Sequence, residues 1–100
     1  MKWKITFINT DTGFITYNII PFEQGQTVYY CKRKRNRYAV YKSVVESMFA
    51  ANSYGIRLRN DVFKHEYVLA YDFDKIFDNK QSAIDFCIER NQQLKTKVYE

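Results

Sequence analysis

Apolar and polar residues alternate along several short segments of this chain, and a repeat of two residues is typical of a β-strand with one buried face. The first segment, Lys2 to Ile8, places three large apolar side chains on one face: Trp3, Ile5 and Phe7. A turn-forming stretch at residues 9–13 follows, in which Gly13 can adopt a positive φ. The return segment, Phe14 to Ile20, places Ile15, Tyr17 and Ile19 on one face. The two segments therefore predict a β-hairpin, and Pro21 and Gly25 are expected to end this sheet.

Three more strands are predicted further along the chain. Thr27 to Lys34 is the third strand and ends in a basic segment. Ile56 to Asn60 points Ile56 and Leu58 inward and its two arginines outward. Glu66 to Phe73 has the longest alternation, with one face formed by Tyr67, Leu69, Tyr71 and Phe73. Its other face, with Val68 and Ala70, is also partly apolar, so we expect a central strand covered on both sides.

Residues 38–53 fit two different patterns. Apolar residues recur at helical spacing, which predicts a helix with one apolar face: Tyr41, Val44, Val45, Met48 and Phe49. Asn36 is then the expected cap of this helix, and Gly55 its expected end. The alternative is a fourth strand over Tyr38 to Val45, because β-branched and aromatic residues are common there. Of the two, we favour the helix.

A second helix is predicted from Asn79 to Leu94. Asp78 is a suitable N-cap, Gln81 completes a pair similar to a capping box, and Phe77 can pack against the first turn. The apolar stripe of this helix consists of Ala83, Ile84, Cys87 and Ile88.

The predicted fold is one α+β domain over residues 1–100, because a chain of 100 residues has room for one hydrophobic core. The expected order is β-β-β-α-β-β-α, and the short connections favour an antiparallel sheet with two packed helices. We expect the face of Leu69 to be buried against the first strand and against Ile84 and Ile88 of the last helix.

The positive charge is concentrated in the first part of the chain. The formal net charge is +5, and residues 1–60 contain ten Lys and Arg but only three Asp and Glu. Five of the six residues from Lys32 to Arg37 are cationic. In an extended chain, Arg33, Arg35 and Arg37 would share one face, with Lys32 and Lys34 on the other.

These residues predict a surface that binds phosphates, since arginine matches phosphate geometry. Four tyrosines flank the run and can stack on bases: Tyr29, Tyr30, Tyr38 and Tyr41. The expected partner is a nucleic acid or a nucleoprotein. The alternative is an acidic protein surface without nucleic acid, because arginine and tyrosine also anchor protein interfaces. The candidate binding residues are Lys32, Arg33, Lys34, Arg35, Arg37, Arg57, Arg59, Tyr30 and Tyr38.

No catalytic, metal or cofactor motif is found in the sequence. Asp72 and Asp74 would share a strand face, but the calcium-loop pattern fails because Phe77 stands where glycine is needed. Cys31 precedes four cations that would favour its thiolate, yet His65 is the only histidine and nothing places it nearby. Glycines are isolated, so no phosphate-binding loop exists. We therefore expect a protein that is not an enzyme and that needs no cofactor.

Several features suggest where such a protein occurs. The start of the chain alternates and does not resemble a secretory signal, and two cysteines are few for a small secreted domain, so we expect a cytoplasmic protein. No apolar run is long enough for a membrane span. Residues with AT-rich codons (Lys, Asn, Ile, Tyr and Phe) make up 43 of 100 positions, which is associated with a low-GC bacterium, its phage or a plasmid. In size, coding bias and basic surface, the chain is similar to small phage proteins that include inhibitors of bacterial defence systems.

Overall fold

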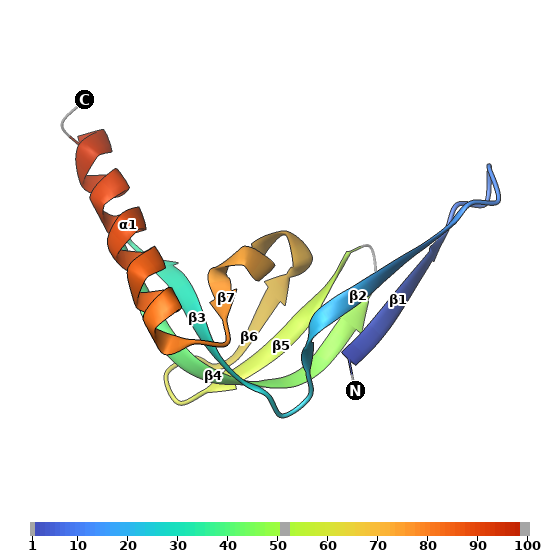
Figure 1. Ribbon diagram of the computed structural model, residues 1–100, viewed down its shortest axis with the longest axis horizontal. Coiled ribbons are helices and arrows are strands. Elements are labelled where there is room, and N and C mark those ends of the chain that lie inside the picture. Colours follow the sequence, from blue (N-terminus) through green and yellow to red (C-terminus); the bar gives the residue numbers. More distant parts are fainter. Residues whose placement is uncertain (1, 51–52, 99–100) are drawn as a thin grey trace.

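A five-stranded antiparallel sheet, a two-stranded sheet and one C-terminal α-helix form a small α+β domain (Figure 1). The computed structural model describes residues 2–50 and 53–98. Within these residues the elements are β1 (Lys2–Ile8), β2 (Ile15–Glu23), β3 (Thr27–Lys34), β4 (Arg37–Ala50), β5 (Tyr54–Asn60), β6 (Lys64–Leu69), the 3-10 helix η1 (Ala70–Lys75), β7 (Ile76–Phe77) and α1 (Lys80–Val98). The predicted α+β class and antiparallel pairing are confirmed, whereas the α-helix predicted within residues 38–53 is wrong.

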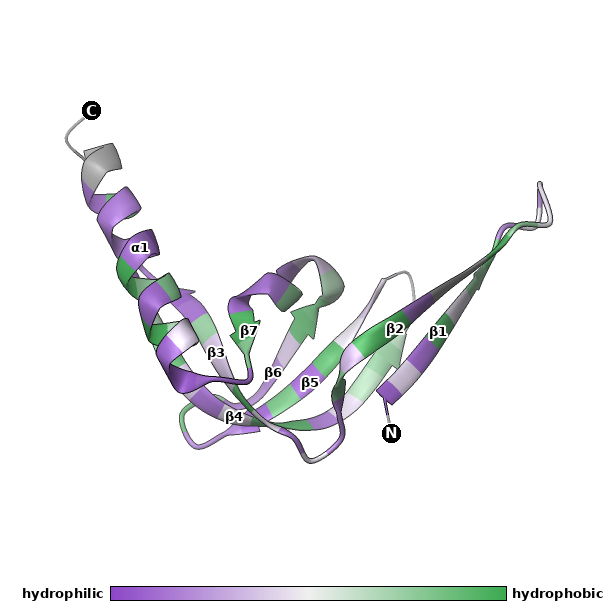
Figure 2. Ribbon diagram, viewed as in Figure 1, coloured by the Kyte–Doolittle hydropathy of each residue, from purple (hydrophilic) through white to green (hydrophobic). Residues whose placement is uncertain are grey.

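The five-stranded sheet has the order β6-β5-β4-β3-β7, and β1 and β2 form a separate two-stranded sheet. The β1–β2 hairpin packs on one face of this sheet, which we call the hairpin face. Its core consists of Ile5, Ile20, Phe22, Val28, Tyr30, Val45, Ile56, Leu58, Val68 and Ile76. The opposite face, here the helix face, is covered by α1 over β3 and β4. The smaller cluster there contains Cys31, Ala83 and Cys87, and α1 is otherwise largely hydrophilic (Figure 2).

Residues 37–50 form the strand β4, so the predicted helix is wrong and the alternative reading is correct. Val45 pairs with Leu58 and Met48 pairs with Ile56, with a β-bulge between Val45 and Ser47. Leu58 and Ile56 lie on the same face of β5, so the extra residue in β4 brings Val45 and Met48 to that face as well. The bulge therefore produces a spacing of three that resembles helical periodicity.

The residues that were expected to cap and to end that helix lie in a turn and in a strand. Asn36 lies in the β3–β4 turn. Gly55 lies within β5, where a side-chain Cβ would approach the Phe49 ring to 2.8 Å. Residues 51 and 52 are outside the described residues.

The predicted central strand from Glu66 to Phe73 is instead the edge strand β6 followed by η1. Val68 is buried, whereas Tyr67 and Tyr71 are 62% and 74% exposed, so the predicted buried face is also wrong at these two tyrosines. Phe73 does pack, partly buried, against the core as expected. The pairing explains both differences. Tyr67 pairs with Arg57 and follows it to the exposed side, and Leu69 pairs with Gly55, one residue from the start of β5. Beyond Leu69 the chain has almost no partner left and turns into η1.

The β1–β2 hairpin is an arm that extends away from the end of the sheet opposite α1 (Figure 1). Ile5 and Ile20 hold its base in the core. Ile8 pairs with Ile15 and Lys4 pairs with Ile19, which places the three isoleucines on the outer face of the arm. The predicted common face of Ile15 and Ile19 is therefore confirmed, and it is exposed. The Tyr17 side chain lies outside the described part of the structure.

Pro21 does not end the sheet as predicted, because β2 continues to Glu23. The register shifts between Lys2 and Lys4, opposite the segment that contains Pro21. Proline is tolerated at such an irregularity on a strand with a single neighbour, since no ladder hydrogen bond has to come from its nitrogen.

The helix α1 was predicted well in extent but not in its cap or packing. The Ser82 backbone N–H donates to Asn79 Oδ1 at 3.1 Å, so Asn79 caps the helix in place of the predicted Asp78. Gln81 donates to Asp85 instead of closing a capping box. Ala83 is buried as expected, but Ile88 is half exposed. The expected contact of Ile88 with the first strand is wrong, because α1 and the β1–β2 arm lie on opposite faces of the sheet.

Candidate functional site

The basic run is folded into a hairpin whose turn is only two residues long, Arg35 and Asn36. In the β3–β4 register, Lys34 pairs with Arg37 and Arg33 pairs with Tyr38. Lys34 and Arg37 therefore lie on the hairpin face, whereas Arg33 lies on the helix face. The expected common face of Arg33, Arg35 and Arg37 is wrong, because the chain reverses direction between them.

The cations of the run differ in how they are neutralised. Lys32 Nζ lies 2.9 Å from Glu66 Oε2 and 4.0 Å from the centre of the Phe63 ring. The Arg33 Nε–H donates to the Arg35 carbonyl oxygen at 3.1 Å. The side chains of Lys34, Arg35 and Arg37 have no ion pair or hydrogen bond within the described residues. Arg33 also keeps its charge, because a carbonyl oxygen does not neutralise a guanidinium, but its side chain lies on the helix face. Away from that face, Lys34, Arg35 and Arg37 are the exposed cations of the run that remain available to an anion.

The three free cations line one concave surface together with Ala39 and Tyr41, and we call it the cationic pocket. Its volume is about 390 Å³. Arg37, Ala39 and Tyr41 are alternate residues of β4, so the pocket runs along the hairpin face from the turn toward the middle of the strand. Its outer end is cationic and its inner end is apolar and aromatic.

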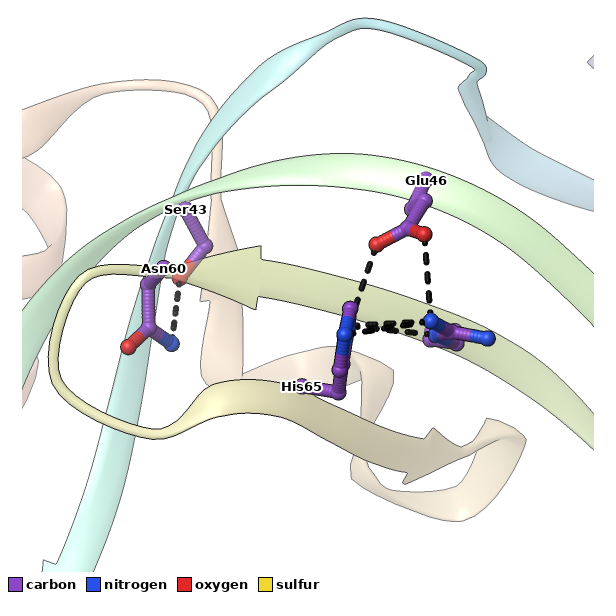
Figure 3. A network of polar contacts seen from close by, with 5 residues as sticks. Ser43, Glu46, Asn60 and His65 are labelled. Atoms are coloured by element: carbon purple, nitrogen blue, oxygen red, sulfur yellow. Dashed lines mark hydrogen bonds and ion pairs between the residues drawn. The ribbon is translucent and has the colours of Figure 1, made fainter.

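A short chain of contacts braces the inner end of the pocket. The Tyr41 ring contacts the Phe63 ring edge-on, at 4.6 Å between centroids and 67° between planes. Phe63 is held by its loop, because Asn60 Oδ1 accepts the backbone N–H groups of Val62 and Phe63 at 2.9 and 2.7 Å. Asn60 is buried and its Nδ2 donates to Ser43 Oγ at 3.3 Å (Figure 3). The Tyr41 ring is thus held in place by a chain of contacts that starts at buried Ser43 and Asn60 and passes through Phe63.

Two unfavourable features are retained at the turn. Lys34 and Arg37 are directly opposed like charges, which destabilise an antiparallel pair. Arg35 has a φ of 59°, in the left-handed region that favours glycine or asparagine. Both features place positive charge at the tip of the hairpin, where a neutral residue or a glycine would be more stable.

Arg57 and Arg59 lie on the helix face, away from the pocket. Arg57 Nη2 is 3.2 Å from Glu46 Oε1 and 3.1 Å from His65 Nδ1. Figure 3 shows Glu46 on β4 reaching toward His65 on the neighbouring hairpin, and their closest atoms are 3.2 Å apart. Arg57 is therefore already neutralised, whereas Arg59 is exposed.

Neither of the predicted tyrosines lines the pocket. Tyr30 is 8% exposed, and burial, aided by the nearby Glu66 and Asp72 carboxylates, raises its pKa to about 12. Tyr38 packs edge-on against Phe86, with its backbone held by Asn91. Of the pocket residues, Ala39 was missed by the sequence analysis, and Tyr41 was named there as a flanking tyrosine but not among the candidate binding residues. The strand alternative for residues 38–45 would have found them, because it places them on the face of Arg37.

The other candidate chemical groups are dispersed. Cys31 is buried and donates to the Ala83 carbonyl oxygen at 3.3 Å, and burial raises the pKa of its thiol, which opposes the effect expected from the four cations that follow it. Asp72 and Asp74 lie in η1 and not on a strand, and Asp72 pairs with Lys75. Among residues 2–50 and 53–98, no three His, Cys, Asp or Glu side chains gather as metal ligands would.

No described helix is both long and apolar enough to cross a membrane. No protein-family model matches this chain, and neither a curated protein nor a solved structure shows detectable similarity to it.

Proposed function

We propose that this protein is a non-enzymatic binding module that engages nucleic acid through the cationic pocket of the β3–β4 hairpin. The observation that carries the proposal is the set of three un-neutralised cations on one concave surface, two of them directly opposed across the strands. A phosphate placed between Lys34 and Arg37 relieves their repulsion. Phosphate binding is therefore favoured further, because it removes a repulsion that destabilises the free protein.

The lining residues fit phosphates better than they fit a reaction. Arginine binds phosphate oxygens in a bidentate manner and lysine acts as a point charge. Among the lining residues there is no carboxylate, histidine or cysteine to act as acid, base or nucleophile. Phosphate contacts position a nucleic acid without reading its sequence. In the cytoplasm of a phage-infected cell, such a module would act as an inhibitor that occupies a nucleic acid or nucleoprotein.

The test is the salt dependence of binding to labelled DNA and RNA. Three phosphate contacts predict a loss of roughly 20- to 40-fold between 50 and 200 mM salt, because each contact releases about 0.7 counterions from single strands and about 0.9 from duplex DNA. The double variant Lys34→Gln, Arg37→Gln is expected to lose most of the affinity and most of this slope.

The matched control is Lys80→Gln, Lys95→Gln, which removes the same charge from exposed positions of α1. An equal loss in both double variants would show that only net charge matters and would overturn the pocket as the site. No binding tighter than about 100 μM at low salt would overturn the nucleic-acid proposal itself. The alternative, an acidic protein partner, predicts this second outcome together with a captured partner that survives nuclease treatment.

A further inference from the structure

The aromatic inner end of the cationic pocket favours one form of nucleic acid, single-stranded or duplex, over the other. We infer that the pocket takes a single strand, with phosphates on Lys34, Arg35 and Arg37 and one unpaired base against Tyr41 and Ala39. This inference rests on the proposed function and names the ligand of the same site.

The layout of the pocket separates phosphate contacts from base contacts. Alternate residues on one strand face are about 7 Å apart, so Arg37, Ala39 and Tyr41 form a row about 13 Å long. The positive charge lies near the turn, and the Tyr41 ring lies four residues along β4 from Arg37. A nucleotide can span such a row with its phosphate at one end and its base at the other.

The aromatic end is built as a fixed platform. Tyr41 is braced by Phe63, and Phe63 is packed in turn under Lys32, which Glu66 holds. Lys32 is thus the cation of the basic run that packs on Phe63 and is neutralised by Glu66, and it does not bind phosphate. A ring that is already held in place loses little freedom when a base stacks on it.

A duplex does not offer a base to this platform. In a duplex the bases are paired and stacked inside the helix, whereas an unstacked base of a single strand can stack on an aromatic side chain. A volume of about 390 Å³ is within the range of sites that hold one small molecule. Arginine and lysine can read guanine, but here Lys34, Arg35 and Arg37 are assigned to phosphates, and the lining has no Asn, Gln, Asp or Glu side chain to read other base edges. Base identity is therefore expected to have little effect.

The experiment compares oligothymidine and oligoadenosine single strands with a duplex of equal length, by fluorescence anisotropy at fixed salt. Both single strands are expected to bind more tightly than the duplex. Tyr41→Ala is expected to weaken single-strand binding roughly 5- to 150-fold, the effect of losing one stacked base, and to leave duplex binding within about twofold. Tyr41→Phe keeps the ring and should bind like the parent protein.

Two further variants separate the platform from folding and from general aromatic loss. Tyr71→Ala removes a ring that is 74% exposed in η1, outside the pocket, and should change nothing. Ala39→Leu fills the pocket while the contact between Tyr41 and Phe63 remains, and it should weaken the single strand selectively. Melting curves confirm that each variant is folded.

The inference is overturned if the duplex binds as tightly as both single strands, or if Tyr41→Ala and Ala39→Leu both bind like Tyr71→Ala. The proposed function fails in a different way. If Lys34→Gln, Arg37→Gln still weakens every nucleic acid, the cationic pocket remains the binding site and only the single-strand preference is lost. If that double variant has no effect either, both proposals fail.

Discussion

Replacing Lys34 with glutamate is expected to stabilise the protein and weaken its binding at the same time. Lys34 and Arg37 are directly opposed in the β3–β4 register. Opposite charges in such a position contribute roughly 0.2–1 kcal/mol, and like charges destabilise the pair. Both side chains are exposed, so solvent screening favours the lower part of that range. The swing from repulsion to attraction is then about 0.5–1 kcal/mol, which raises Tm by roughly 2–8 °C in a domain of this size.

The same substitution lowers the charge of the cationic pocket by two units. At least one phosphate contact is lost, so the salt slope of duplex binding falls by about 0.9 or more. The assays are thermal unfolding at about 20 and 500 mM salt and anisotropy titration of a labelled oligonucleotide. The stabilisation is expected at low salt and should largely vanish at high salt, because the Debye length then shrinks to a few ångström.

Lys42→Glu is the matched control for Lys34→Glu. It makes the same charge change on β4, but Lys42 is exposed on the helix face and its cross-strand partner is Tyr29. It should not raise Tm at low salt, and it should weaken binding less. A Lys34→Glu protein that is no more stable than the parent at low salt would refute the reasoning about the pair. Unchanged affinity would refute the assignment of the pocket.

Three other outcomes are expected. Arg35→Gly removes the strain of the left-handed backbone, and stability should rise by about 0.5 kcal/mol after the extra entropy loss of glycine is subtracted. The same variant should weaken oligonucleotide binding. Lys64→Gly, at the other non-glycine position with positive φ (65°), should raise Tm without weakening binding. Asn79→Ala should lower stability in urea by about 1 kcal/mol through loss of the helix cap, and Asp78→Ala should change it little. The pKa of Tyr30 is raised from 10.0 to about 12, so the folded protein holds the phenol proton more tightly than the unfolded chain does. Denaturant titrations should therefore find that the free energy of unfolding falls as pH rises from about 10 toward 12. Tyr30→Phe should remove that part of the decline.

Much of the sheet could be predicted because alternation is a local property of the sequence. β1, β3 and β5 were recognised from their own residues. β4 was not, because the bulge between Val45 and Ser47 gives a strand the spacing of a helix. β6 was extended too far, because its end depends on where β5 begins to offer a partner. Register and partner length are properties of two strands together and cannot be read from one.

The candidate site was predicted in part for a similar reason. The density of cations between Lys32 and Arg37 is visible in the sequence. Which of them are neutralised is not, since Lys32 meets Glu66, 34 residues away, through the fold. The turn at Arg35 decides which cations share a face. Tyr41 joins the pocket only because residues 37–50 form a strand.

The β1–β2 arm has a consequence for local stability. Its base is buried with Ile5 and Ile20, but farther out the outer face exposes Ile8 and Ile15, and no third strand joins the hairpin among residues 2–50 and 53–98. A two-stranded hairpin is at best marginally stable by itself. Amide hydrogen exchange should therefore form a gradient along the arm, slow at Ile5 and fast at Asn9, whose backbone N–H donates to the Phe14 carbonyl oxygen at 2.8 Å next to the turn. The distal half opens and closes with its own small free energy while the five-stranded sheet stays intact.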